Sequence, residues 1–406
     1  MGLLPRFLRR SPQLEERAMT VAPAGLELTL PYSGERVSPL TCDQNTAVGR
    51  AIQLISNDLA KVPRTLMRRT ANGAEPDTSS ALWRLFDTSP NVEQSGFEFW
   101  RYMTSIYCRY GNAFALISKN GRGDVLQLIP MDPQSISIEI DQKGGTFYYN
   151  HAELGLLEPE EVFHLRFSGL TDETGVLGLS PVIRGREALG LAKAQEKAGG
   201  SVYKNAASPR MALRHPGTLS DKAGARLAEQ FSKAHAGPES AGKAILLEEG
   251  MDAQILQPLQ LESAQWIDAR RFSIGEVSRI FGVPAPYLSD NTNSTYSNVN
   301  QLVRMYVDGC LSHHAAIWQA EIQFKLLSPD QYLDIDLSYV QRGSFTDEIA
   351  ALNQAVTSGI MTPNECRHRL GLNPLEGLDA PRLRLDTGVV NQDDENDDRN
   401  PFDTDE

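Results

Sequence analysis

Three long amphipathic helical patterns in the second half of the chain most constrain its fold. The first opens with Ser180 and Pro181 in the favoured cap and first-turn positions and runs to about Asn205, about 40 Å of helix. The second covers Leu261–Phe281, and the third covers about 30 residues from Val299. Helices of this length on both sides of a small insert do not pack readily into one compact globule. The pattern predicts an elongated subunit that buries its helices against neighbouring copies.

The segment before these helices has the pattern of an α+β unit over residues 41–175. Apolar residues recur at helical spacing from Ala47 to Leu59 until Pro63 ends the run, and a second helix is predicted over Gly96–Tyr110. Between Ala113 and Phe167 the spacing becomes that of strands, in the runs AFALIS, VLQLIP, SISIEI, TFYY and VFHLRF. We expect these strands to form an antiparallel sheet packed with the two helices.

Both ends of the chain depart from regular periodicity. Residues 1–40 contain scattered prolines, which predicts a mobile arm with ordered structure beginning near Thr41. Residues 386–406 are rich in Asp and Glu and poor in apolar residues, which predicts a disordered, solvated tail.

Composition excludes some classes of function. The net charge of -13 disfavours tight, static DNA binding, which needs clustered Lys and Arg. No stretch reaches the ~20 apolar residues of a membrane span. The cysteines lie far apart, and no His or Cys pair has metal-ligand spacing, so we expect reduced core thiols, a cytosolic assembly environment and no metal site. These cysteines are Cys42, Cys108, Cys310 and Cys366.

The insert between the first two long helices carries the one catalytic pattern worth weighing. A helix is predicted from Ser220 to about His235, followed by strands at Ala244–Glu248 and Ala253–Leu256. Gly237, Gly242 and Lys243 match GxxxxGK, but Ala244 stands where magnesium binding needs Ser or Thr. The helix also precedes the strand, which is the reverse of a P-loop. A helix-to-strand loop is therefore the preferred interpretation, and an ATPase or nuclease is the alternative.

A polar loop separates the second and third long helices. Residues 285–298 are rich in Asn, Ser and Thr and carry one charge, Asp290. A long loop inside an ordered domain is usually functional or disordered. If several copies faced DNA, its side chains would offer weak, exchangeable hydrogen bonds and the duplex would slide. The candidate DNA-contacting residues of this loop are Tyr287, Asn291, Asn293, Ser294, Thr295, Tyr296 and Asn298.

Ten segments occur in the order of a known family: AIQLISNDLAKVP, SPN with FEFW, YGNAFALI, DVLQLIPMDP, GLSPV, SPRMALRHPGTLS, AGKAILLEEGM, ARRFSIGEVSRIFGVPAPYL, TYSNVNQ and GIMTPNECRHRLGLNPLEGLD. Spread over about Thr41–Asp379, they resemble the portal proteins of tailed phages, of the Hong Kong ninety-seven type. No single segment is decisive, but their shared order is.

The resemblance implies an elongated α+β portal subunit with an antiparallel-sheet wing, long stem and tunnel helices, a small α/β clip and a short helical crown. The implied division, after the mobile arm 1–40, is wing 41–179, first stem helix 180–205, clip 206–260, second stem helix 261–283, tunnel loop 284–298, tunnel helix and return to the wing 299–343, crown 344–385 and tail 386–406.

The resemblance also implies a twelve-subunit ring at one capsid vertex, assembled in the host cytoplasm and carried in the virion of a phage, prophage or gene transfer agent. It implies a passive channel for double-stranded DNA without catalytic residues or cofactor. Expected partners are the terminase large subunit, the head-tail adaptor and the major capsid protein, with no membrane. Lys193 and Lys197 are candidates to face DNA from the first stem helix, or to pair with Glu187 and Glu196. Candidate clip-docking residues are Arg210, Arg214 and His215.

Overall fold

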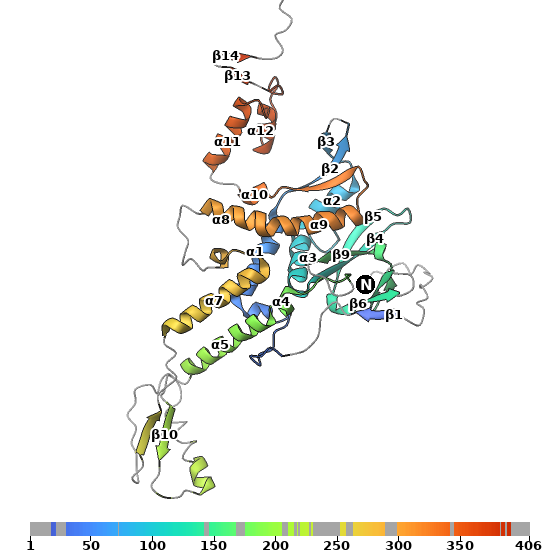
Figure 1. Ribbon diagram of the computed structural model, residues 1–406. Coiled ribbons are helices and arrows are strands. Elements are labelled where there is room, and N and C mark those ends of the chain that lie inside the picture. Colours follow the sequence, from blue (N-terminus) through green and yellow to red (C-terminus); the bar gives the residue numbers. More distant parts are fainter. Residues whose placement is uncertain are drawn as a thin grey trace, which may run out of the picture. The chain divides into compact units, whose positions relative to one another are not determined.

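The fold is known from a computed structural model (Figure 1). It describes residues 18–21, 30–71, 73–141, 146–167, 175–204, 210–214, 217, 220–226, 229, 252–256, 263–288, 299–341, 345–381, 383–385 and 388–390. The chain divides into two compact units, residues 1–337 and residues 338–406. Each is considered by itself.

A helical core lies in the first unit. Its helices are α1 (Thr46–Lys61), α2 (Ala81–Asp87), α3 (Gly96–Tyr110) and α9 (Ser312–Lys325). Asn45 caps α1 by accepting hydrogen bonds from two backbone N–H groups, and Ser95 and Glu98 form a capping box on α3. At the centre of the core, Trp100 stacks on Trp318 with ring centroids 3.8 Å apart. The helices predicted from spacing for α1 and α3 are therefore confirmed.

The strand-like runs form two antiparallel sheets, where we had predicted one. The first sheet has the order β5-β4-β9 and the second β1-β6-β7-β8. Their bounds are β1 Ala18–Val21, β4 Asn112–Lys119, β5 Val125–Met131, β6 Ile136–Asp141, β7 Phe147–His151, β8 Gly155–Leu157 and β9 Val162–Arg166. The one-sheet prediction is wrong because a 3-10 turn at Pro133–Ser135 separates β5 from β6, and β9 returns to pair with β4. The sheets share a core in which the rings of Phe114 and Tyr149 meet edge to face, 5.8 Å apart.

β1 corrects the prediction for the N-terminal segment. Residues 18–21 pair antiparallel with β6, with Ala18 opposite Asp141 and Val21 opposite Ile138. Regular structure therefore occurs before Thr41, within the range we expected to form an arm. The prolines do not prevent this, since none falls within β1.

A third sheet joins distant segments of the first unit. β2 (Arg64–Thr70) lies between β3 (Gly73–Pro76) and β12 (Gln331–Ile335), and β12 follows α9 directly. The chain thus returns from its last long helix to the strand that follows α1. We had not predicted β2.

The long helices are close to the predicted spans. The first consists of α4 (Pro181–Arg184) and α5 (Arg186–Lys204), and the second is α7 (Ser263–Phe281). The third begins with α8 (Val299–Tyr306) and continues through η7 (Val307–Leu311) into α9. A 3-10 turn, η5 (Ala285–Leu288), follows α7. In the insert, β10 (Arg210–Arg214) pairs antiparallel with β11 (Asp252–Leu256). Residues 221–226 are helical, as predicted, whereas the predicted strand Ala244–Glu248 lies outside the described residues. No described helix is long and apolar enough to cross a membrane.

The second unit is small and mostly helical. It contains α10 (Ser338–Gln341), α11 (Phe345–Thr357), α12 (Pro363–Arg369), β13 (Leu383–Leu385) and β14 (Gly388–Val390). Asn364 holds it together, because its amide nitrogen donates to Leu375 O and to Asp379 Oδ1, both at 2.8 Å. The tail prediction is wrong for residues 388–390, which pair with β13 where apolar residues interrupt the acidic stretch. Residues 391–406 lie outside the described residues.

Candidate channel helices

The first long helix is anchored at its start to the end of α3. Ser180 Oγ accepts a hydrogen bond from Ile183 N–H at 3.2 Å and donates one to Arg109 O at 2.6 Å. Pro181 follows at the first helical position, as its fixed φ favours. The Ser-Pro pair identified in the sequence therefore caps α4 and also ties it to α3.

A close approach of two glycines reinforces this anchor. A Cβ on Gly111, whose φ is +82°, would lie 2.5 Å from Ser180 N, and one on Gly178 would lie 2.4 Å from Gly111 O. Only glycine fits at either position without moving the backbone. Asn112 joins the same two segments of the chain. Its Oδ1 accepts a hydrogen bond from Gly178 N–H at 2.8 Å, and its Nδ2 donates one to Gly178 O at 2.7 Å. His164 Nε2 adds a third contact to Asn112 Oδ1 at 3.0 Å.

α5 packs against α7, and α7 packs against α1 (Figure 1). A cavity of about 340 Å³ lies between the three helices. Its lining includes Ala192, Gln195 and Glu196 from α5, with Ser273 and Ile274 from α7. These residues identify the faces that α5 and α7 turn toward each other.

Lys193 and Lys197 contact the N-terminal segment of their own chain. Lys197 Nζ lies 2.8 Å from Glu35 Oε1, and Lys193 Nζ donates to Arg36 O at 3.1 Å. These two ammonium groups therefore contact Glu35 and the Arg36 carbonyl rather than Glu187 and Glu196, the partners considered from the sequence. The reason is that residues 31–36 run along this face of α5, which helical spacing alone does not reveal.

A tyrosine at the start of the predicted channel loop meets a tyrosine eight residues past the loop's end, beside α1. Tyr306 at the end of α8 is fully buried, and its hydroxyl donates to Asp58 Oδ2 at 3.1 Å. The half-buried ring of Tyr287 in η5 lies 4.8 Å from the Tyr306 ring, centroid to centroid. Burial and the nearby Asp58 carboxylate raise the pKa of both phenols, so they stay neutral. The other six candidate loop residues, from Asn291 to Asn298, lie outside the described residues.

One turn of the third long helix is a π-helix. Val307–Leu311 form this turn, directly after Tyr306 and before α9. Cys310 in the turn is buried and donates its S–H to Phe281 O, at the end of α7, across 3.5 Å. Burial raises the pKa of its thiol to about 12. π-turns are rare and occur often at functional sites.

The candidate clip residues are only partly described. Arg210 and Arg214 end the strand β10, and the Arg214 side chain is exposed. His215 lies outside the described residues, as do Gly237, Gly242 and Lys243 of the GxxxxGK match. Within the described part of the chain, no three His, Cys, Asp or Glu side chains are grouped to hold a metal ion.

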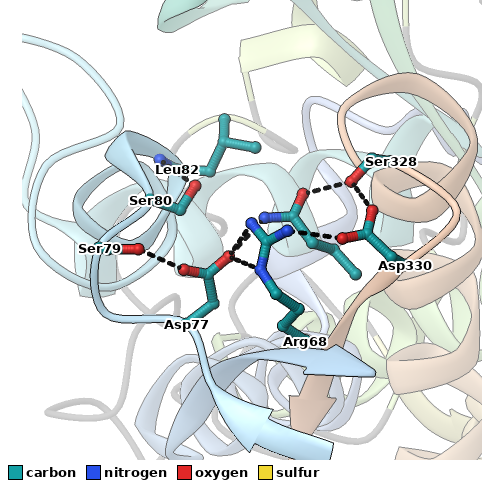
Figure 2. Close-up of polar contacts among 8 residues, drawn as sticks. Arg68, Asp77, Ser79, Ser80, Leu82, Ser328 and Asp330 are labelled. Atoms are coloured by element: carbon teal, nitrogen blue, oxygen red, sulfur yellow. Dashed lines mark hydrogen bonds and ion pairs between the residues drawn. The ribbon is translucent and has the colours of Figure 1, made fainter. Parts of the chain in front are cut away.

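A polar network that the sequence did not predict joins β2, the segment before α2 and the start of β12. Figure 2 shows Arg68 between two carboxylates, with its guanidinium 2.7 Å from Asp77 Oδ2 and 2.6 Å from Asp330 Oδ2. Gln331 Nε2 also donates to Asp77, at 2.7 Å. Hydrogen bonds from Gln331, then Arg68 and Ser79, lower the pKa of Asp77 to about 2. These contacts satisfy every group within the cluster, which indicates a structural role.

The four cysteines match their predicted role as core thiols. Cys42, Cys108, Cys310 and Cys366 are all buried and free of disulfides. Burial raises the pKa of the Cys108 thiol well above its ordinary value. Buried thiols of raised pKa are inert.

Comparison with known proteins agrees with this architecture. The portal protein of Enterobacteria phage HK97 is 28% identical over 347 residues, which cover 83% of this chain and 81% of that protein. The probable portal protein of Streptomyces phage phiC31 is 26% identical over 390 residues, covering 89% and 82%.

Solved structures share the fold. The chain in the neck of a native gene transfer agent particle with C12 symmetry aligns at a TM-score of 0.53 and 20% identity, covering 84% of this chain and 96% of that chain. An HK97-family phage portal protein from Corynebacterium diphtheriae aligns at 0.56 and 17%, covering 75% and 97%. Residues 46–371 match the family model described as phage portal protein. Since this match extends over well more than half of the sequence, the chain belongs to the phage portal protein family.

Proposed function

We propose that this chain is one subunit of a dodecameric portal ring at a capsid vertex, which forms a passive channel for DNA entering and leaving the head. The observation that carries the proposal is the family match over residues 46–371. Support comes from the likeness to a chain in a gene transfer agent neck of C12 symmetry. The paired helices α5 and α7, which lead into and out of the 205–262 insert, suit a stem that carries a clip.

The division into wing, stem, clip, tunnel loop, tunnel helix and crown follows the boundaries expected from the sequence. In this assignment the sheets and α1–α3 form the wing, α5 and α7 the stem, and α8–η7–α9 the tunnel helix. The 206–260 insert is the clip, and α11 with α12 forms the crown. The joint of Gly111, Asn112 and Gly178 then fixes the stem to the wing.

Contact with DNA is assigned to the tunnel loop, residues 284–298. Its amide and hydroxyl side chains form weak contacts, and twelve copies of a chain with net charge -13 add no strong attraction for phosphate. Both conditions favour sliding of the duplex. Lys193 and Lys197 contribute less, because Glu35 and the Arg36 carbonyl engage their ammonium groups.

The clip residues Arg210, Arg214 and His215 are proposed to dock first the terminase large subunit and later the head-tail adaptor. The wing is proposed to contact the major capsid protein. The ring would assemble in the host cytoplasm and remain at the vertex of the virion, whether of a phage or a gene transfer agent. No chemical step is assigned to the chain, since ATP hydrolysis belongs to the terminase.

Native mass spectrometry of the purified protein, with negative-stain images, tests the proposal. We expect closed rings of about twelve subunits with a central hole, although purified portals also form neighbouring ring sizes. A stable monomer that hydrolyses ATP would overturn the proposal and return attention to Lys243.

The channel role needs a second test. Shortening residues 291–298 while keeping Tyr287 and Tyr306 should spare ring assembly and reduce DNA packaging or retention. The matched control shortens residues 142–145, which connect β6 to β7. Filled, stable heads from the first variant would refute the channel role of the loop.

A further inference from the structure

A tight turn before α1 is attached to the first long helix at Glu187 and Gly190. In the turn Pro31–Gly34, Gly34 N–H donates to Pro31 O at 2.8 Å, and the φ of Gly34 is +74°. Tyr32 N–H donates to Glu187 Oε2 at 2.9 Å. A Cβ on Gly190 would lie 2.8 Å from Ser33 Oγ and 2.9 Å from Pro31, so only glycine admits the turn this close. The lysine contacts to residues 35 and 36 extend the attachment along α5.

The turn is fixed in place, yet its aromatic side chain is left in solvent. The relative exposure of Tyr32 is 101%, and Leu30 and Leu40 on either side are exposed by 59% and 67%. A tyrosine with a fixed backbone loses little conformational freedom when a partner covers it. Such side chains are typical anchors of protein interfaces. We call Leu30, Tyr32 and Leu40 the turn surface.

A second exposed apolar surface lies on α7. Its centre is Phe272, which is 63% exposed. Phe272 precedes the buried Val277 and Phe281 by five and nine residues, which places it about 140° and 180° around the helix from them. The Arg279 guanidinium lies 5.6 Å from the Phe272 ring centroid on this outer face. We call Phe272 and Arg279 the α7 surface.

The two surfaces lie on opposite sides of the α5–α7 pair. Residues 31–36 contact α5 at residues 187, 190, 193 and 197, which share one helical face. Residues 192, 195 and 196 lie on the opposite face of α5 and line the cavity shared with α7. Phe272 in turn faces away from Ser273 and Ile274, which line that cavity. The order across the pair is therefore turn surface, α5, α7 and α7 surface. In Figure 1 the dark-blue segment of residues 30–40 and the yellow α7 lie on either side of α5.

We infer that the turn surface of one subunit packs on the α7 surface of the next copy of this chain. This inference rests on the proposed ring, because a closed ring joins unlike surfaces head to tail and requires one on each side of the subunit. An aromatic side chain buries about 150–250 Å² when it is covered, and a standard interface buries about 800 Å² per partner. Tyr32 and Phe272 therefore supply the anchors of the contact rather than its whole area.

A cross-linking experiment tests the contact. The double variant Tyr32→Cys, Phe272→Cys is treated with a short bismaleimide as assembled rings and run on a denaturing gel. We expect a ladder of dimers, trimers and larger oligomers, since each link joins one subunit to the next. The two single variants are controls and should give no ladder, because the four native cysteines are buried.

The outcomes separate this inference from the ring itself. Wild-type protein that forms no ring would overturn the proposed function. Intact rings of the double variant without a ladder would overturn only this contact. Labelling of Tyr32→Cys that duplex DNA blocks, and ring assembly does not, would place the turn on the channel wall and also overturn it.

Assembly measurements give an independent test. Tyr32→Ala should raise the subunit concentration needed for half-assembly by about tenfold, as expected for loss of one interface anchor of about 1.4 kcal/mol. Leu126→Ala is the matched control, since Leu126 is also exposed, at 54%, but lies on β5. Equal assembly of Tyr32→Ala and wild type would contradict the inference.

Discussion

Lowering the pH should destabilise the subunit through His314, a buried histidine of α9. His314 is 2% exposed, and its Nδ1 lies 2.8 Å from the hydroxyl of Tyr107. Burial, aided by the neighbouring His313, lowers its pKa from 6.5 to about 3. Because the unfolded chain takes up a proton near pH 6.5 and the folded chain does not, stability is present above pH 6.5 and is lost as the pH falls toward 3.

The size of the effect follows from these two pKa values. Between pH 8 and pH 5 the loss is about 2 kcal/mol, and it reaches about 4 kcal/mol at pH 3. His164 is also buried with a lowered pKa and adds to the loss in the same direction. The contribution of His314 is therefore measured as a difference between variants.

Urea unfolding at pH 8, 7, 6 and 5, at one subunit concentration, provides the assay. The variant His314→Asn keeps a polar atom toward Tyr107 but cannot take up the proton. Its free energy of unfolding should therefore fall by about 2 kcal/mol less than that of wild type between pH 8 and pH 5. Tyr107→Phe is the control: it should lower stability at every pH while keeping the pH dependence. An equal pH dependence in His314→Asn and wild type would refute the reasoning.

Three further predictions concern the same unit. Trp318→Ala should lower the free energy of unfolding by about 3–5 kcal/mol, since it leaves a cavity at the centre of the helical core. Calorimetry measures this as a lower melting temperature, and an unchanged melting temperature would contradict it. Tyr306→Phe should cost about 1–3 kcal/mol in urea unfolding, because Asp58 loses its hydroxyl donor, and a neutral result would mean that the Asp58 contact does not contribute. Asp77→Asn should remove the loss of stability between about pH 4 and 2, because a carboxylate whose pKa is lowered to about 2 stabilises the fold above pH 3.8 and loses that effect as the pH falls. An acid titration by circular dichroism that is the same for the variant and wild type would contradict this.

The helices were predictable because the information that specifies them is local. α3 begins and ends at the predicted residues Gly96 and Tyr110, since a capping box opens it and Gly111 in the left-handed region closes it. The cap at Ser180 and Pro181, at the start of α4, was likewise predictable from the sequence. The family was recognisable from ordered short segments rather than from any one motif.

The parts that were not predictable depend on contacts between distant segments. Tyr306 and Asp58 are separated by 248 residues, and Lys197 and Glu35 by 162, so no spacing rule connects them. The assignment of strands to two sheets was missed for the same reason, because alternation identifies a strand but not its neighbour. The one local signal of the turn surface was the sequence from Pro31 to Gly34, whose proline and glycine are typical turn residues.

The π-turn at Val307–Leu311 also sets the rotational phase between α8 and α9. It holds one residue more than an α-turn would, and each residue adds about 100° of rotation to a regular α-helix. The π-turn takes up this extra residue locally, so Tyr306 before it and Trp318 after it both keep their buried positions, against Asp58 and Trp100. A one-residue deletion within the turn would therefore join α8 and α9 as one regular α-helix and leave Tyr306 near the side that faces α1.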